Sequence, residues 1–554
     1  MHFEEIIMTT NLYLPIGIDD FKEVKTACYY VDKTLFLEDI INSPSSSTFL
    51  FTRPRRFGKS LMLSMCKYFF DIKSNSLSLF KNTALVKKDS SYLDYLNKYN
   101  VIHLNLKSIN GVSYEEFVDT IKFKVSELYA DLLNDNTVKY VKSIIDRKCT
   151  IIELKQALYY LSKALYQKNK AKSVVLIDEY DTPLENAYVK NYFSEARDFM
   201  KDFMGNVLKS NPYLYKAVVT GVTQVAHSSI FSDLNNMMIN NIVSNKVEHF
   251  GFSEKETNEL LNYYNFKGNF DEVKKWYGGY YFQNQEVFNP WSIINFISNI
   301  FVFKAYWANT GSYKLLKETV SLLKSEVNNE LLDLASGKQI NVLINETINY
   351  DYLNNNINLY SLLAFGGYLS IRKDDPSDYY SIRIANEEIR LSFNKEIIEG
   401  LTNKESFLVL RKIRDSLLSF DVNGFIENIT YYIFDRMSYL DLNSEKAYQI
   451  VIITITSILM DNALIKSEIE QGQGRCDIYI KSALNNDYAY IIELKYRKNR
   501  PSSIELSKSA SFALNQIKEN YYYSDAKRSG VKKILLLGMA LSNKNKEYKF
   551  EIIE

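Results

Sequence analysis

Gly58, Lys59 and Ser60 form a tripeptide whose residue types suit the binding of phosphate. A phosphate-binding loop surrounds its ligand with backbone N–H groups at a helix N-terminus. A lysine neutralises the outer phosphates, and a serine or threonine ligates Mg²⁺. The tripeptide lies in FTRPRRFGKSLML (51–63), between a strand-like run and an apolar helix-like run, so it predicts such a loop.

The beginning of this loop departs from the usual pattern. Arg53 stands five residues before Gly58, at the position where a first glycine would serve a tight turn. We therefore expect the turn to be built differently in this chain. The tripeptide alone is a weak signal, because an ordinary helix start can have the same residues.

A second signal is VVLIDEYD (174–181), in which four apolar residues precede Asp178 and Glu179. A hydrophobic strand that ends in Asp-Glu is typical of enzymes that hold Mg²⁺ beside a nucleotide and polarise the attacking water. Three interpretations stay open: a nucleotide hydrolase, a site that binds nucleotide without hydrolysing it, and a helix start and strand end without a ligand.

A second group of residues lies near the end of the chain, in GRCDIYIK (474–481) and YAYIIELKYRK (488–498). Strand alternation places Glu493 and Lys495 on one face and Leu494 on the other. Two carboxylates, Asp477 and Glu493, can bind a hard divalent cation, and a lysine beside them can orient or activate the attacking water. This is the restriction-endonuclease-like PD-(D/E)xK pattern; the alternative is a simple salt bridge between Glu493 and Lys495.

Basic residues surround the second group: Lys495, Arg497, Lys498 and Arg500 lie within six residues. Such a cluster suits contacts with the phosphates of a nucleic acid, each of which adds salt-sensitive affinity. The same pattern is equally common in a basic turn that is exposed to solvent and binds no nucleic acid.

Strand-like runs alternate with helical text in the first part of the chain. They are TFLFT (48–52), NVIHLNL (100–106), KSVVLIDEYD (172–181) and KAVVTGVT (216–223). Buried β-branched runs between helices indicate a parallel α/β sheet with helices on both faces. Upstream of them, the apolar residues of 12–42 recur at mostly helical spacing.

The chain of 554 residues is long enough for several domains, and we predict three. Residues 1–245 form the parallel-sheet domain of a P-loop NTPase, and 246–430 a mostly helical module. Residues 431–554 form a compact α/β unit with the order helix, hairpin, strand, helix and strand.

Composition narrows the class of protein. The 67 basic and 66 acidic residues give no overall charge that would point to nucleic acid or a membrane. The 4 cysteines are scattered without metal-ligand spacing, which favours a reducing compartment. We expect no membrane segment and a cytoplasmic location.

Several motifs together resemble the AAA-ATPase-like family of predicted ATPases. They are LPIGIDDF (14–21), YYVDKT (29–34), FLFTRPRRFGKSL (49–61), VLIDEYDTPL (175–184), VVTGVTQVAHSSIFSDLNN (218–236), WYGGY (276–280), NPWS (289–292) and YWANTG (306–311). The resemblance covers residues 10–554, and in that family an R-P-R-R-F-G-K-S loop is usual.

The resemblance implies roles for individual residues of the first domain. The nucleotide-binding residues are Arg55, Arg56, Gly58, Lys59, Ser60, Asp178 and Thr220; of these, Ser60 and Asp178 also hold Mg²⁺, and Glu179 is catalytic. Arg53 is a further source of positive charge, and a basic loop exposed to solvent is the alternative for these arginines. Gln224 stands where relatives often have an arginine, and Asp32 and Lys33 are motif residues without a chemistry that we can derive.

The resemblance also covers the nuclease-like domain that ends this family. It implies that Asp477 and Glu493 hold the metal, with Glu445 as an additional ligand, that Glu493 and Lys495 are catalytic, and that Gln516 supports the site. Gly474, Arg475 and Tyr522 belong to the same context.

The expected protein is therefore an ATP-binding and ATP-hydrolysing protein coupled to a Mg²⁺-dependent nuclease that acts on DNA or RNA. The first alternative keeps the ATPase but lets the C-terminal domain bind nucleic acid or protein without cleavage. The second is a nucleotide-gated interaction protein with a protein partner or a homo-oligomeric state. No guanine-specific N-K-x-D motif is evident, so ATP is preferred to GTP.

Overall fold

The computed structural model divides the chain into two compact units, 1–310 with 341–388, and 311–340 with 389–554. Each unit is described by itself. The residues that the structure describes are 12–43, 47–132, 141–225, 230–231, 234, 236–243, 249–283, 285–307, 330–331, 334, 337–350, 356–373, 378–393, 407–436, 444–459, 463–472, 474–482, 487–498, 501–542 and 545–554. The borders of the units differ from those of the three predicted domains, so the three-domain division stays a prediction.

The first unit is built on a five-stranded parallel sheet with the order β2-β3-β4-β1-β5. Its strands are β1 (Thr48–Thr52), β2 (Asn100–Asn105), β3 (Ser173–Asp178), β4 (Leu214–Gly221) and β5 (Met237–Asn240). The four predicted strands are confirmed, and β1 and β3 are buried along their whole length. Burial on both faces explains their continuous apolar runs.

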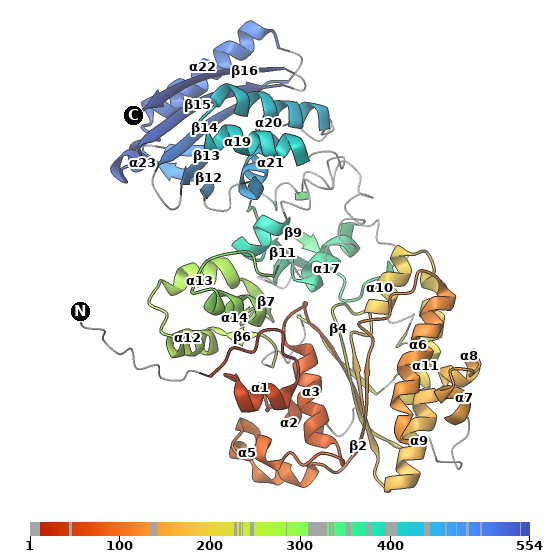
Figure 1. Ribbon diagram of the computed structural model, residues 1–554. Helices are drawn as coiled ribbons and strands as arrows, with labels where there is room; N and C mark the ends of the chain where they lie inside the picture. Colours follow the sequence, from red (N-terminus) through yellow and green to blue (C-terminus); the bar gives the residue numbers. More distant parts are fainter. Residues whose placement is uncertain are drawn as a thin grey trace, which may run out of the picture. The chain divides into compact units, whose positions relative to one another are not determined.

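Helices cover both faces of this sheet, as predicted; α3 lies on one face and α6, α9 and α11 on the other (Figure 1). The helices of this part are α1 (Phe21–Ala27), α2 (Phe36–Ile41), α3 (Lys59–Phe70), α4 (Leu77–Phe80), α5 (Ala84–Lys88), α6 (Tyr114–Leu128), α7 (Val141–Ile145), α8 (Ile151–Lys155), α9 (Ala157–Asn169), α10 (Thr182–Val189) and α11 (Phe193–Leu208). Two 3₁₀ helices span Ser90–Tyr95 and Ala130–Leu132.

The segment 12–42 is not one continuous helical stretch, because an extended segment separates α1 from α2. Asp32 lies in this break and explains it. Its carboxylate accepts hydrogen bonds from the backbone N–H groups of Thr34 at 2.9 Å and of Ala84 at 2.9 Å, which caps the start of α5. Lys33 forms an ion pair with Glu256 at 2.7 Å. The two motif residues without an assigned chemistry therefore connect structural elements.

The remaining part of the first unit is helical, as predicted, but it also holds two small three-stranded sheets. Its helices are α12 (Glu254–Tyr263), α13 (Phe270–Tyr277), α14 (Pro290–Ser298) and α17 (Asn356–Gly366). The sheets have the orders β6-β8-β7 and β10-β11-β9. Their strands are β6 (Phe252–Ser253), β7 (Tyr280–Phe282), β8 (Gln285–Phe288), β9 (Ile340–Leu343), β10 (Leu369–Arg372) and β11 (Tyr379–Ile384).

The second unit is a five-stranded mixed sheet with the order β12-β13-β14-β15-β16. The strands are β12 (Ala463–Gln471), β13 (Gly474–Ser482), β14 (Tyr488–Tyr496), β15 (Lys533–Leu541) and β16 (Lys546–Ile553). Only β14 and β15 are parallel, and the connection between them contains α22 (Ser503–Glu519) and α23 (Ser524–Arg528). The predicted order of elements is confirmed, and β16 adds an edge strand that was not predicted.

Two apolar cores lie on opposite faces of this mixed sheet. One core joins alternate strand residues to α19 (Phe407–Leu418), α20 (Val422–Arg436) and α21 (Glu445–Leu459). The other joins the intervening strand residues to α22 and α23. The sheet is therefore a middle layer between helices, which Figure 1 shows in the blue part of the chain.

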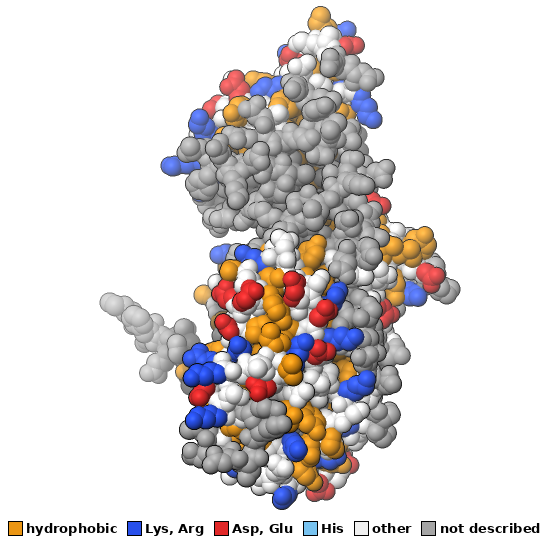
Figure 2. Space-filling model, turned by 90° about the vertical axis from the view of Figure 1, so that its right-hand side faces the viewer, with side chains coloured by type: hydrophobic (Ala, Val, Ile, Leu, Met, Phe, Trp, Pro, Cys, Tyr) orange, Lys and Arg blue, Asp and Glu red, His pale blue; other side chains and the backbone are white. Residues whose placement is uncertain are grey.

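No helix among the described residues is long and apolar enough to cross a membrane. The space-filling view of the face that carries α6, α8 and α11 shows described Lys and Arg side chains mixed with Asp and Glu (Figure 2). This mixture agrees with the nearly balanced charge of the sequence.

Candidate functional site

The predicted phosphate-binding loop occupies residues 53–58, between the end of β1 and the start of α3. Gly58 has a φ of 84°, and no atom lies within 4 Å of the position where a Cβ would stand. The left-handed backbone, and not a lack of space, therefore favours glycine here. The strand-loop-helix order is the one that a phosphate loop requires.

Lys59 is buried at the start of α3, and its ammonium group donates to the backbone carbonyls of Arg53 at 2.9 Å and Pro54 at 3.0 Å. The lysine therefore spans the loop. Burial lowers the pKa of Lys59, while the nearby carboxylates, Glu179 first among them, raise it in part.

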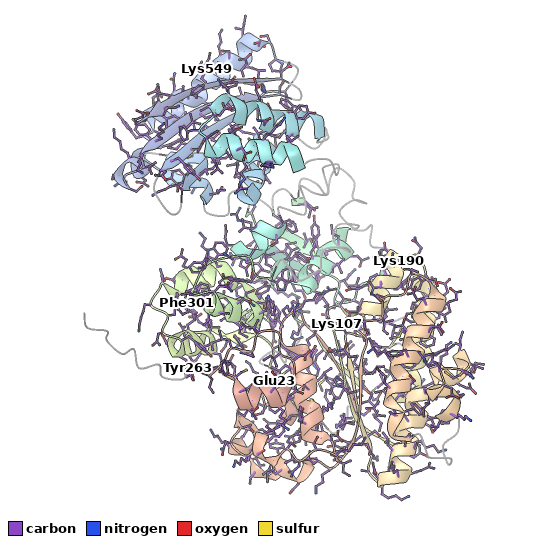
Figure 3. The ribbon with its side chains drawn as sticks, viewed as in Figure 1. Glu23, Lys107, Lys190, Tyr263, Phe301 and Lys549 are labelled. Carbon is purple, nitrogen blue, oxygen red and sulfur yellow. The ribbon has the colours of Figure 1, made fainter. Side chains whose placement is uncertain are left out.

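Asp178 lies at the end of β3 and joins three other strands or helices at one edge of the sheet. Its Oδ2 accepts from the Ser60 hydroxyl at 2.6 Å, and its Oδ1 accepts from the Thr220 hydroxyl at 2.6 Å. The Asn105 amide donates to Oδ2 at 3.3 Å. Lys107 is labelled in Figure 3 just beyond the end of β2, at this edge. The structure thus brings together Ser60, Asp178 and Thr220, and it adds Asn105, which the sequence did not suggest.

Glu179 follows Asp178 with a φ of 52°, which is uncommon for a residue other than glycine. Backbone strain of this kind is often stored at functional sites. The Thr182 hydroxyl donates to Glu179 Oε2 at 3.3 Å. The neighbouring Tyr180 fixes the position of Glu179, because the Tyr180 hydroxyl donates to the Thr223 carbonyl at 2.9 Å. Gly221 packs so closely on this residue that a Cβ there would lie 2.7 Å from the Tyr180 ring.

Asp181 completes the acidic group beneath the loop and was not singled out from the sequence. Its Oδ2 accepts from the backbone N–H groups of Val222 at 2.8 Å and Thr223 at 2.7 Å. Its Oδ1 is buried and has no hydrogen-bond partner among the described residues. Asp181 therefore contributes negative charge close to the cations of the loop.

Arg53 does not contribute an exposed charge to the loop, because its side chain is fully buried. The guanidinium donates to the carbonyls of Thr52 and Asn240, both at 2.8 Å. It also lies 5.1 Å from the ring centroid of Phe250 and 5.2 Å from that of Phe282. Burial lowers the pKa of Arg53 to about 9. The residue that replaces the first glycine is thus an internal anchor of the loop.

Arg55 and Arg56 have different environments. Arg55 pairs with Glu185 on α10 at 2.9 Å, and burial raises the pKa of Glu185 to about 7 although Arg55 opposes this rise. The Arg56 guanidinium lies 4.3 Å from the Trp291 ring centroid. The Trp307 indole donates to the Arg55 carbonyl at 3.2 Å. Residues of NPWS and YWANTG therefore hold the loop from one side.

Two further expectations concern Gln224 and the remaining residues of the recognised motifs. Gln224 is buried, and its carbonyl accepts from the Ile348 N–H at 2.7 Å, so it joins two backbone segments. Residues 226–229, 232–233, 235 and 308–311 of the recognised motifs lie outside the described residues.

The C-terminal group assembles on two inner strands of the mixed sheet, β13 and β14. The register between β13 and β14 ends at the pair Ile478 and Ile492, so Asp477 and Glu493 lie just beyond this paired stretch. Asp477 Oδ2 accepts from the Leu494 N–H at 2.8 Å. Leu494 packs into the core with α19, α20 and α21, while Glu493 faces α22. The predicted alternation is therefore present.

Glu493 is the central group of this site and is only 2% exposed. Its Oε1 accepts from Lys495 at 3.0 Å and from the Gln516 amide at 2.5 Å. Its Oε2 is buried and has no hydrogen-bond partner among the described residues. Gln516 also lies 3.4 Å from the Tyr522 hydroxyl. The salt bridge between Glu493 and Lys495 exists, but Gln516 makes it part of a larger group.

Burial raises the pKa of both carboxyl groups of the site. Burial raises the pKa of Asp477 to about 6 and, with Asp477 as a further cause, the pKa of Glu493 to about 7. Burial by itself lowers the pKa of Lys495, but Glu493, Glu445 and Asp477 outweigh it and raise that pKa.

Glu445 starts α21 at the border of the site. Its Oε2 accepts from the Tyr496 N–H at 3.1 Å, and its Oε1 lies 3.8 Å from the Lys495 ammonium. Gln449, one turn later, donates to the Asp477 carbonyl at 2.6 Å and was not suggested by the sequence. Arg500 of the basic cluster lies outside the described residues.

The residues of this site fit a divalent cation. Glu493 Oε2 is a buried oxygen without a hydrogen-bond partner among the described residues, and Asp477 lies just beyond the paired stretch of the neighbouring strand. Among the described residues, no three or more His, Cys, Asp or Glu side chains are grouped as a complete metal cage. Mg²⁺ commonly binds through one or two carboxylates plus waters and substrate phosphates, which suits this arrangement.

The two sites lie in segments that match two known families. Residues 15–231 match the family model described as predicted AAA-ATPase. Residues 443–551 match the model of the PD-(D/E)XK nuclease superfamily. The chain thus carries an AAA-ATPase-like domain and, after it, a PD-(D/E)XK nuclease superfamily domain, which confirms the resemblance drawn from its motifs.

A relative spans both domains. It is described as the uncharacterized protein in vnfD 5'region of Azotobacter chroococcum mcd 1, and it is 24% identical over 555 residues, which cover 98% of this chain and 98% of that protein. No solved structure matches this chain.

Proposed function

We propose that this protein binds and hydrolyses ATP in its first domain and that its C-terminal domain is a Mg²⁺-dependent nuclease that acts on DNA or RNA. The observation that carries the proposal is that each predicted set of residues converges. The hydroxyl of Ser60, the residue after Lys59, donates to Asp178 Oδ2 at 2.6 Å. Glu493 Oε1 accepts from both Lys495 and Gln516.

In the first domain, Lys59 and the N–H groups at the start of α3 bind the phosphates of ATP. Ser60 and Asp178 would hold Mg²⁺, and Thr220 fixes the orientation of Asp178 through its hydrogen bond. A bound Mg²⁺ supplies positive charge for the phosphoryl group that is transferred. Glu179 accepts a hydrogen bond from the attacking water and orients it toward the outermost phosphorus.

Arg55 and Arg56 would complete the phosphate-binding group. Arg55 is paired with Glu185 at 2.9 Å and Arg56 lies over Trp291, so both guanidinium groups are already held near the loop. A planar guanidinium can contact a phosphate with two N–H groups.

In the C-terminal domain, Asp477 and Glu493 would hold the cation, with Glu445 at the border as an additional ligand. The cation, when bound, supplies charge to stabilise the phosphate in the transition state. Lys495 donates to the attacking water or to a phosphate oxygen, because its ammonium already lies 3.0 Å from Glu493. In the reaction, the water oxygen gives up a proton to solvent and bonds to phosphorus, the bond to one sugar oxygen breaks, and that oxygen takes up a proton.

A cleavage assay tests the nuclease. Supercoiled, linear and single-stranded DNA and RNA are incubated with Mg²⁺ or Mn²⁺, with and without ATP, and wild type is compared with Lys495→Ala. We expect metal-dependent cleavage that is lost in the variant. Lys549→Ala is the control, since Lys549 is an exposed lysine of the same domain outside the basic cluster. Absence of cleavage while ATP hydrolysis persists would reject the nuclease and leave the ATPase.

A second candidate function is a nucleotide-gated interaction protein whose C-terminal domain binds nucleic acid without cutting it. The contacts of Arg55 and Arg56 with Trp307 and Trp291 favour it, because movement of the loop would disturb residues far along the chain. In that case ATP changes the oligomeric state or a protein partner's affinity, and turnover is slow.

A further inference from the structure

One border of α22 connects the C-terminal carboxylate site to an exposed aromatic ring. Gln516 donates to Glu493, and Phe512, one turn earlier, is 63% exposed. Ser509 precedes Phe512 by three residues and accepts from the Arg497 guanidinium at 3.0 Å. Residues three and four apart are neighbours on a helix surface, so Ser509, Phe512 and Gln516 follow one border.

Phe512 does not serve the core of this unit. The buried residues of α22 are Leu506, Ser509, Ala510, Ala513 and Ile517. They allow the helix to approach β15 so closely that a Cβ at Gly538 would lie 2.4 Å from the Ala510 carbonyl. Phe512 lies beside this packed face. A single exposed apolar residue is common on protein surfaces, so its neighbours must decide its meaning.

The neighbours of Phe512 are cationic side chains and residues of the carboxylate site. Lys508 is exposed one turn before Phe512, and Arg497 and Lys498 are exposed just after β14. Cations bind phosphates, and an aromatic face stacks on a base; together they are the components of sites for single-stranded nucleic acid. A base that is paired in a duplex has no free face for such a ring.

Resting on the proposed nuclease function, we propose that Phe512 is a base-stacking platform and that the preferred ligand of this site is a nucleic acid with unpaired bases. The base next to the phosphate at Glu493 and Lys495 stacks on Phe512, and Arg497 and Lys508 contact the neighbouring phosphates. DNA and RNA share this chemistry, and oligonucleotides of each kind distinguish them.

The test uses the full-length chain with Lys495→Ala, which prevents cleavage during the measurement. Fluorescence anisotropy gives the Kd for oligo-dT, for oligo-rU and for a DNA duplex of equal length. The additional substitutions are Phe512→Leu, which keeps an apolar side chain without a ring, and Phe512→Tyr, which keeps the ring. Ile504→Ala is the matched control, because Ile504 is 70% exposed on the same helix.

Phe512→Leu should weaken single-strand binding by about 5- to 100-fold, since base stacking on an aromatic residue contributes an affinity of this order. Duplex binding should be unchanged, and Phe512→Tyr and Ile504→Ala should both bind as the parent does. Equal binding by the Leu variant, an equal loss for the duplex, or a loss with Tyr would each overturn the inference. So would a change of oligomeric state in the Leu variant without a change in nucleic-acid binding, which would assign Phe512 to a protein interface.

The outcome separates this inference from the function on which it rests. If the wild-type protein cleaves and Phe512→Leu binds single strands normally, only the stacking platform is rejected. If single strands bind through Phe512 but neither Mg²⁺ nor Mn²⁺ supports cleavage by the wild-type protein, only the nuclease is rejected. Absence of binding to every oligonucleotide, with no cleavage, rejects both.

Discussion

In the nucleotide loop, the described cationic side chains have partners within the protein, whereas the C-terminal site leaves one buried oxygen of Glu493 without a donor among the described residues. Lys59 bonds to loop carbonyls, Arg55 to Glu185, and Arg56 lies on Trp291. A phosphate that enters the loop must therefore replace existing contacts. A cation that reaches Glu493 gains an oxygen that no donor of the described residues contacts.

This difference teaches how each site depends on its ligand. In the nucleotide loop, a phosphate replaces contacts within the protein. Its binding is therefore coupled to movement, because each replaced contact releases a side chain or a backbone segment. Addition of a partner to a buried oxygen stabilises the arrangement that is already present, because an unpaired buried polar atom destabilises the protein. The first site is thus suited to a switch and the second to a rigid catalytic centre.

The largest expected effect concerns catalysis at the switch-like site. Glu179→Gln keeps the size of the side chain and removes its charge, so ATP turnover should fall by about 10²- to 10⁴-fold. ATP binding should persist, because Lys59 and the loop are unchanged. Phosphate release and calorimetric binding measure the two effects. Glu195→Gln, an exposed residue of α11, is the control; normal turnover in the Glu179 variant would remove that residue from the mechanism.

Arg53→Gly tests whether the loop depends on its internal anchor. The substitution removes two hydrogen bonds to carbonyls and contacts with two aromatic rings. The free energy of unfolding of the first unit should fall by about 2–4 kcal/mol. Urea unfolding measures it. Arg147→Gly is the control at an exposed arginine, and it should not destabilise the protein because the φ of 58° there suits glycine; an equal effect of both substitutions would contradict the anchor.

Glu388→Gln tests a buried acid that supports the same loop. The Ser292 hydroxyl donates to Glu388 at 2.7 Å, as does the Trp307 N–H at 2.5 Å. Burial raises its pKa from an ordinary 4.5 to about 7. Since the folded-state pKa is the higher one, its contribution to stability is present below pH 4.5 and is lost as the pH rises through about 7.

Between pH 5 and pH 8 the wild-type protein should therefore lose about 2–3 kcal/mol of unfolding free energy that the Gln variant does not lose. Urea unfolding at both pH values measures the difference, with Glu195→Gln as the exposed control. Parallel pH profiles of wild type and Glu388→Gln would show that this acid is not protonated in the folded protein.

The smallest expected effect concerns the rigid site. Gln516→Leu removes the amide that orients Glu493, and metal affinity or cleavage should fall by about 10- to 100-fold, as for other groups that support a metal ligand. Titration with Mn²⁺ and the cleavage assay measure it. Asn515→Leu, at the exposed neighbouring position, should have no effect. If the two variants behave alike, the interpretation of the C-terminal site as a preorganised centre is rejected.

The sequence predicted those elements whose pattern is local. Buried β-branched runs identified β1, β2, β3 and β4, because parallel strands are apolar on both faces. It did not predict β16, because this edge strand is partly exposed and mixes Lys and Glu with its apolar residues. The short β5 also lacked a distinct pattern.

The candidate sites show the same limit. Gly58, Lys59 and Ser60 could be recognised because a phosphate loop is contiguous in sequence. The burial of Arg53 could not, because Phe250 and Phe282 come from distant parts of the chain. Asn105 and Glu185 reach the loop only through the strand order and the position of α10. Gln516 was suggested by family resemblance alone, since no local pattern connects it to Glu493.

The parallel pairing of β14 with β15 sets the time at which the C-terminal site can form during synthesis. Asp477, Glu493 and Lys495 are made before the partner strand of Glu493, which contains Gly538 and follows only after α22 and α23. Parallel pairing across a long connection forms slowly, because the loop must close before its contacts can stabilise it. A nascent chain released before β15 would thus have all three residues and no assembled centre.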